Sequence, residues 1–442
     1  MVDDIKREKM LAIYAFLITD FIQILFVSIL YLDDTTPFVV GIDFSRSNPL
    51  TSVSLFFAIV TMQVIMIYII AYQTLRKTDL IELLPQYDKS TKWKCRYSRD
   101  EIVEWTQTLA KKSGVSVRKI YMMDSPLPNA FTFSLPFIGS VVVVHSNTLE
   151  VLNAEEVQAI ITHELGHIKN RDSLVAIFTR MPSFFVDLIY IYVYIRLILA
   201  LLTSALIGDF YLAGIRVVGL VAFFLLSRIF AALSKFFMQK GSRAAELLGD
   251  YHAASVLGHE ATINSLIRLG QRVEAITALF EEITWLESLN PERTGPITRS
   301  ELLRMITQYP LNAIDEVNAR EVAPDVFLST RLKQMREVYG VDLSDDQIEK
   351  AVQPAVASLH EKRVEGKDES EPLKITQTID WRIFDYDENR RLSNEELSDL
   401  LKQLRENPQK MLFDQEVGVT FHTMDHPDFR RRVLFIADQF GL

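Results

Sequence analysis

The stretch His163-Glu164-Leu165-Gly166-His167 decides the fold of this chain. Two histidines at this spacing lie on the same face of an α-helix, one turn apart, so both imidazoles can reach one metal ion. The glutamate that follows the first histidine can take a proton from a metal-bound water. This H-E-x-x-H pattern is typical of zinc metalloproteases. It predicts that His163 and His167 bind one zinc ion per chain and that Glu164 is the general base.

The residues on both sides of the motif predict a helix beside a small sheet. From Ala154 onward apolar residues recur with a helical period, and Asn147 or Asn153 is a candidate cap for that helix. A second helix is predicted upstream and ends at Gly114. Two short apolar runs predict strands, with a proline-containing loop between them. The expected ranges are 101–113 for the upstream helix and 119–123 and 140–144 for the strands.

A zinc protease needs a third protein ligand and leaves a fourth position for water. The sequence offers Glu246 and, one helical turn later, Asp250. We expect Glu246 to bind zinc and Asp250 to accept a hydrogen bond from a ligand histidine, a role that Asp172 could share. The alternative interpretation of Glu246 and Asp250 is a solvated acidic helix face.

Four stretches are long and apolar enough to cross a bilayer core of about 30 Å. Hydrophobic residues make up 49% of the chain and charged residues 24%, with a mean hydropathy of +0.13. That mixture favours membrane spans attached to a water-exposed part. For the last two stretches the alternative is buried core helices of a soluble domain. The predicted spans are 11–32, 53–72, 184–207 and 211–237.

The third and fourth spans are joined by little more than Gly208-Asp209, which predicts an antiparallel hairpin. If its helices continue out of the membrane, His167 and Glu246 come side by side, on the order of 15–25 Å beyond the bilayer surface. Polar residues inside the spans are expected to face the bundle interior or to snorkel toward the ends. These residues include Asp20, Asp187, Arg196, Arg216 and Arg228.

The distribution of lysine and arginine predicts the orientation in the membrane. Basic residues precede the first span and follow the second and the fourth, whereas the link between the first two spans holds three aspartates and one arginine. Both termini and the zinc motif of a multi-pass plasma-membrane protein would then face the cytoplasm. A net charge of −10 argues against attraction to nucleic acid, and the single Cys95 excludes an intrachain disulfide.

Together these features resemble the HtpX-type membrane zinc metalloproteases, a branch of the gluzincin group. The resemblance covers Pro128-Asn129-Ala130-Phe131, the run 141–144, Ser242, Arg243, Glu246, Asp250, His426-Pro427, Arg432 and Val433. Two spans before the motif and two between the ligands are also the HtpX arrangement. The resemblance implies a base at Glu164, zinc ligands at His163, His167 and Glu246, and membrane or misfolded proteins as substrates in stress-related quality control. The chain departs from the family at Thr132-Phe133-Ser134 and in the length of 275–419.

Further residues are candidates for contacts with substrate. The tetrahedral intermediate of peptide hydrolysis needs a donor, for which His426 comes first and Arg432 next. The local alternative for His426 is a helix start. An extended substrate could pair with an edge strand near 141–144, which makes Asn129, Val141 and Val143 candidate contacts. An inner strand is the equal alternative.

One loop matches a calcium-binding pattern. Asp385, Asp387, Asn389 and Glu396 occupy ligand positions of an EF-hand loop, but the glycine position holds Arg390. The favoured alternative is a turn followed by a helix that begins with a capping box.

The expected fold is mainly α with a small β-sheet: four transmembrane helices plus a cytoplasmic gluzincin-type zinc metalloprotease domain with a C-terminal helical insertion. The expected function is a zinc-dependent endopeptidase acting on protein or peptide substrates beside the lipid bilayer. A catalytically silent zinc-containing scaffold, a transporter-like protein and a prenyl-protein protease are the alternatives, and the oligomeric state is not fixed. The expected units are two transmembrane hairpins (1–75 and 184–237), two protease parts (76–183 and 238–274), the insertion (275–419) and a returning C-terminal segment (420–442).

Overall fold

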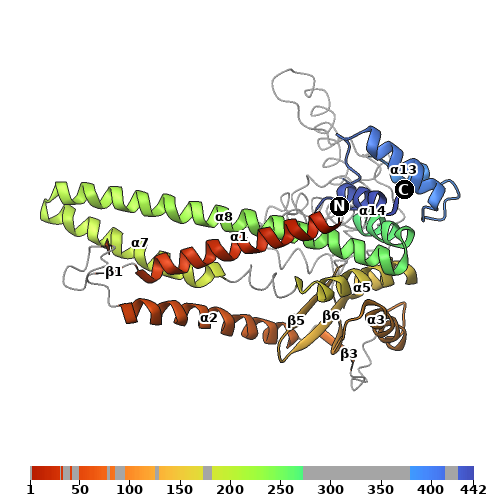
Figure 1. Cartoon of the computed structure of the whole chain (residues 1–442), viewed down its shortest axis with the longest axis horizontal. Coiled ribbons are helices and arrows are strands. Elements are labelled where there is room, and N and C mark those ends of the chain that lie inside the picture. The colour runs from red at the N-terminus through yellow and green to blue at the C-terminus, as the bar shows by residue number, and fades with distance from the viewer. Residues whose placement is uncertain are drawn as a thin grey trace, which may run out of the picture.

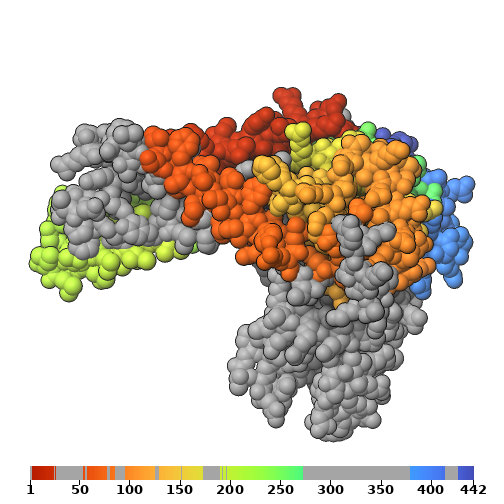
Figure 2. All heavy atoms as spheres, turned by 90° about the horizontal axis from the view of Figure 1, so that it is seen from below, coloured from red at the N-terminus to blue at the C-terminus, as the bar shows by residue number. Residues whose placement is uncertain are grey.

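The computed structural model describes residues 2–29, 31–32, 40–41, 49–76, 80–84, 95–124, 129–172, 182–271, 379–413 and 427–442. Four long helices form an arm that projects from a compact part carrying the sheet (Figure 1). Seen from below, α1 and α2 both lie along this arm and reach the compact part (Figure 2). The long helices are α1 (Val2–Ile29), α2 (Pro49–Leu75), α7 (Pro182–Ile207) and α8 (Phe210–Leu257).

Helices α7 and α8 form the predicted antiparallel hairpin. Gly208 takes a positive φ of 81°, and Asp209 caps α8 by accepting a hydrogen bond from the amide of Leu212. With 48 residues, α8 is about 70 Å long, more than twice the thickness of a bilayer core. The helix therefore runs without a break from the apolar segment to Glu246 and Asp250.

Two described helices are long and apolar enough to cross a membrane, Phe57–Leu75 within α2 and Phe210–Leu257. Four spans were expected. The first expected span lies in α1, and the third lies in α7. Within α7, Val193–Ile207 is an apolar segment shorter than a membrane span. Within the arm, Arg216 donates a hydrogen bond of 2.6 Å to the carbonyl of Ala200 in α7. The side chains of Asp187 and Arg196 lie outside the described residues.

A mixed sheet has the strand order β3-β4-β6-β5, so β6 lies inside and β5 lies at an edge among the described strands. β6 runs parallel to β4 and antiparallel to β5. One face packs on α3 (Arg99–Ser113) and α5 (Ala154–Lys169), and the other on the end of α2. The strands are β3 (Leu80–Leu84), β4 (Lys119–Met123), β5 (Ala130–Leu135) and β6 (Gly139–His145).

The ends of the site helices form as the sequence predicts. Asn153 caps α5, and its side chain and that of Glu156 form a reciprocal capping box. Gly114 ends α3 in the left-handed conformation, with a φ of 71°. The short helix α4 (Ser146–Val151) joins β6 to α5, and two-residue strands β1 (Tyr31–Leu32) and β2 (Val40–Gly41) pair between α1 and α2.

The C-terminal elements share one apolar core with the protease part. Helix 259–271 packs on η2 (Trp381–Phe384), α13 (Asn394–Glu406) and α14 (Phe429–Phe440). Asn264 donates to the carbonyl of Leu392 and accepts from its amide, both at 2.8 Å. The described end of the expected insertion therefore belongs to the same folded body as the C-terminal helix.

We predict that Asn264→Ala destabilises this packing by about 1–3 kcal/mol, because it leaves the buried amide and carbonyl of Leu392 without partners. Thermal unfolding of the purified protein measures the effect. The matched control is His259→Ala, which removes an exposed contact from the same helix to Asn394 and should cost less. Equal stability of wild type and Asn264→Ala would contradict the prediction.

Candidate metal centre

The site lies where α5 crosses α8 at very close range. A Cβ atom on Gly166 would lie 3.2 Å from the Cα of Gly249 and 3.0 Å from the Cβ of His252. A Cβ atom on Gly249 would lie 2.8 Å from the His163 ring. Larger residues at these two positions would force the helices or the ring apart. The two glycines therefore let the histidine face of α5 reach the acidic face of α8.

The three expected ligands meet at this crossing. His163 Nε2 lies 3.1 Å from His167 Nε2, and each of these nitrogens lies 3.5 Å from one carboxylate oxygen of Glu246. A tetrahedral zinc ion with bonds of about 2.0–2.1 Å separates its ligand atoms by about 3.3 Å. Two neutral imidazoles and one carboxylate also form a ligand set found in zinc proteases. The described residues therefore fit a zinc ion.

Both expected supporting aspartates contact the ligand histidines. Asp172 Oδ2 lies 3.0 Å from His167 Nδ1, and Asp250 Oδ1 lies 2.9 Å from His163 Nδ1. A carboxylate at Nδ1 keeps the proton on that nitrogen and leaves Nε2 as a lone-pair donor. Both rings are thus oriented with Nε2 toward Glu246.

The electrostatic environment of the site favours a cation. Burial of His163 disfavours its charged form, but the carboxylates of Asp250 and Glu246 outweigh burial and raise its pKa to about 10. Burial likewise opposes the charge on Asp250, yet Arg432 and His163 hold the pKa of Asp250 below its usual value. A positive charge between His163, His167 and Glu246 would therefore be strongly stabilised.

Arg432 from α14 holds Asp250 through two hydrogen bonds of 2.7 Å each. The same guanidinium lies 3.8 Å from a Glu246 oxygen. Arg432 is 6% exposed, so its ion pair with Asp250 is buried. Arg432 therefore fixes the acidic face of α8. His426, the other candidate donor, lies outside the described residues.

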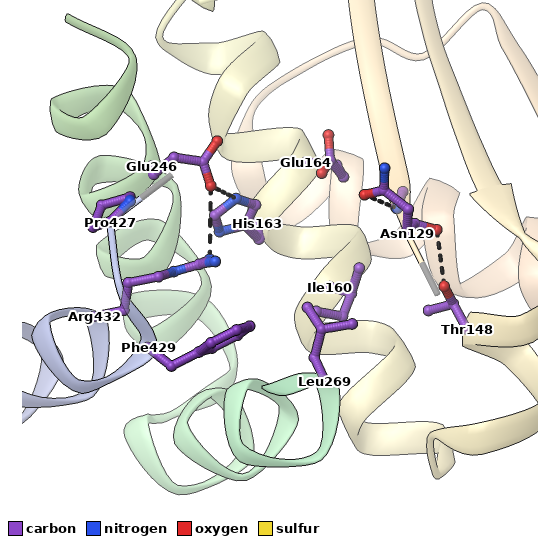
Figure 3. A pocket seen from close by; sticks show the side chains of 11 residues that line it. Asn129, Thr148, Ile160, His163, Glu164, Glu246, Leu269, Pro427, Phe429 and Arg432 are labelled. Carbon is purple, nitrogen blue, oxygen red and sulfur yellow. Dashed lines mark hydrogen bonds and ion pairs between the residues drawn. The ribbon is translucent and has the colours of Figure 1, made fainter. Parts of the chain in front are cut away.

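A pocket opens beside the ligands (Figure 3). Glu164 lies in it between His163 and Asn129, and one of its carboxylate oxygens lies within 4.8 Å of a ring nitrogen of each ligand histidine. Asn129 is held at the start of β5, because its carbonyl accepts hydrogen bonds from the amide of His145 and the hydroxyl of Thr148. The lining comprises Asn129, Ala130, Thr148, Ile160, His163, Glu164, Glu246, Leu269, Pro427, Phe429 and Arg432.

The expectation that Val141 and Val143 contact substrate was wrong. β6 is paired on both sides, and both side chains are fully buried, so the inner-strand alternative is correct. β5 is the edge strand beside α5, and the hydroxyl of Thr132 lies 3.4 Å from the carbonyl of Glu164. The sequence carried a signal for β5, since aromatic and hydroxyl residues alternate in Phe131-Thr132-Phe133-Ser134 between two prolines.

The loop that begins at Asp385 is a turn followed by a helix with a capping box, which is the favoured alternative to a calcium site. Ser393 and Glu396 form the capping box of α13, and the carboxylate of Glu396 accepts hydrogen bonds from the amides of Tyr386 and Ser393. Arg390 adopts the left-handed conformation with a φ of 64°, where calcium loops have glycine. Asp385, Asp387 and Glu396 lie close together, and calcium binding by this loop, with Asn389, stays a prediction.

Comparisons with known proteins indicate the same class of protein as the site geometry does. Residues 98–308 match the family model for peptidase family M48. A "Protease HtpX homolog" of Dictyoglomus turgidum is 45% identical over 64 residues, 14% of this chain and 21% of that protein. The "Protease HtpX" of Idiomarina loihiensis is 28% identical over 181 residues, 40% of this chain and 60% of that protein. The chain thus matches less than two thirds of the length of either relative.

An H-E-x-x-H helix that faces a glutamate on a second helix defines a metalloprotease site. The family match makes the assignment more specific. Residues 98–308 are similar to peptidase family M48, and parts of the chain are similar to HtpX proteases, which supports a metalloprotease.

We predict that Gly249→Ala lowers zinc affinity by at least about tenfold while the protein still folds. The new methyl group would collide with the His163 ring at 2.8 Å, and this ring can turn away only by leaving its ligand position. Metal analysis after dialysis against a chelator measures the loss. Gly219→Ala is the matched control, because it lies in the same helix and its Cβ would meet nothing within 4 Å. Similar zinc retention in both variants would contradict the claim that Gly249 makes room for the His163 ring.

Proposed function

We propose that this protein is a membrane-anchored zinc endopeptidase, with His163, His167 and Glu246 as zinc ligands. One observation carries the proposal: the three donors converge from α5 and α8 at zinc-ligand separations, with Glu164 beside them in the pocket. Zinc held there would acidify a water molecule and polarise the scissile carbonyl. Glu164 would take a proton from the attacking water and pass it to the leaving amine.

The substrate is proposed to bind as an extended strand along β5. An edge strand offers backbone groups to a peptide, and β5 begins at Ala130 in the wall of the pocket. Ile160, Leu269 and Phe429 line the pocket next to the ligands, so an apolar side chain near the cleaved bond suits the site. This arrangement supports unfolded or membrane-derived segments as substrates, because both expose apolar side chains in extended chain.

The supporting groups have separate proposed roles. Arg432 acts as a positioning residue for Asp250, since its guanidinium donates two hydrogen bonds to that carboxylate. His426 precedes Pro427, which lines the pocket, and it is proposed to donate to the tetrahedral intermediate. Asn129, fixed at the start of β5, is proposed to contact the substrate backbone.

The location is proposed to be the plasma membrane, with four spans, both termini in the cytoplasm and the zinc site on the cytoplasmic side. The basic residues that flank the apolar helices support this orientation. The unbroken path of α8 from its apolar segment to Glu246 supports a site close to the bilayer surface. Such a position suits the removal of damaged membrane proteins, and quality control is the proposed role.

We predict that the purified, zinc-loaded protein cleaves casein and that Glu164→Gln reduces cleavage by about a hundredfold or more, because it removes the general base. Glu164→Gln should still bind one zinc ion per chain, since Glu164 is not a ligand. The matched variant Glu246→Ala should lose zinc as well as activity. Equal cleavage by wild type and Glu164→Gln, or no cleavage by a fully zinc-loaded wild type, would favour a zinc-containing scaffold instead.

A further inference from the structure

Lys9 lies near the start of α1, yet it is buried at the metal centre, with an exposed fraction of 5%. Its ammonium group forms an ion pair with Asp172 and donates a hydrogen bond of 3.3 Å to the carbonyl of Asn170. Both partners follow the end of α5, more than 160 positions along the chain. An N-terminal helix of the arm therefore reaches the same carboxylate that contacts His167.

Asp172 needs such a partner. Its exposed fraction is 6%, and a buried carboxylate without a compensating charge is strongly unfavourable. One of its oxygens pairs with Lys9, and the other lies 3.0 Å from His167 Nδ1. Without the ammonium group, Asp172 would lose the ion pair that holds it and would turn toward water. Its contact with Nδ1 of His167 would then weaken.

The start of α1 is also fixed against the second ligand helix. Glu8 forms an ion pair of 3.3 Å with Lys240 of α8, and a Cβ atom on Gly241 would lie 3.6 Å from the methyl group of Ala12. The start of α1 lies beside α8 in the compact part (Figure 1). Lys9 is therefore held in place by a helix that packs against α8 on both sides of it in the sequence.

We infer that Lys9 is a positioning residue for His167, acting through Asp172, so that α1 completes the metal centre. The inference rests on the proposed zinc site. It extends the functional unit from the two ligand helices to the N-terminal helix of the arm.

Zinc affinity of the purified full-length chain, measured by competition with a chromophoric chelator, tests this inference. Lys9→Met should weaken zinc binding about tenfold, and Lys9→Arg, which keeps the charge, should restore much of it. Lys6→Met is the matched control on the same helix, because Lys6 pairs at 3.3 Å with Asp3 in solvent. Lys9→Gln provides the same comparison if Lys9→Met does not fold.

A double-mutant cycle with Asp172→Asn separates positioning from general stabilisation. If Lys9 acts through Asp172, Lys9→Met should have little further effect on zinc affinity in the Asp172→Asn protein. Wild-type affinity in Lys9→Met, or losses that add in the double variant, would overturn the inference. A wild type that binds no zinc would instead overturn the proposed function, so the two failures are distinguishable.

Discussion

The candidate metal centre depends on the close approach of two helix backbones. Gly166 and Gly249 allow α5 and α8 to cross with only hydrogen atoms between them at the contact. Glycine inside a helix costs about 1 kcal/mol relative to alanine, so two such residues facing each other need a packing reason. Here the reason is the reach of the side chains: the His163 ring lies directly against Gly249, within 3.5 Å of Glu246. A wider crossing would hold the same residues too far apart to share an ion.

Remote segments of the chain balance the charges around this crossing. Asp250, under His163, is held by Arg432 from the C-terminal helix. Asp172, beside His167, is paired with Lys9 from the N-terminal helix. Each buried carboxylate thus pairs with a cation from a remote helix and lies against Nδ1 of one imidazole. The protease part and the helical arm are linked through the two aspartates that contact the proposed ligand histidines.

Local patterns in the sequence predicted much of this arrangement. Helical periodicity and caps predicted α3 and α5, and the short link at Gly208 predicted the hairpin that brings Glu246 to the histidines. The prolines that flank 130–135 favour a loop, whereas the alternation within it indicates the strand that forms there. The pairing of Lys9 with Asp172 could not be predicted, because a contact across so much chain leaves no local spacing to recognise.

X-ray absorption at the zinc edge of the zinc-loaded protein tests the central claim most directly. We expect four or five nitrogen and oxygen neighbours at about 2.0–2.1 Å, with multiple scattering from two imidazoles and no sulfur. One imidazole only, or a sulfur neighbour at about 2.3 Å, would contradict the assignment of His163, His167 and Glu246 as the ligands.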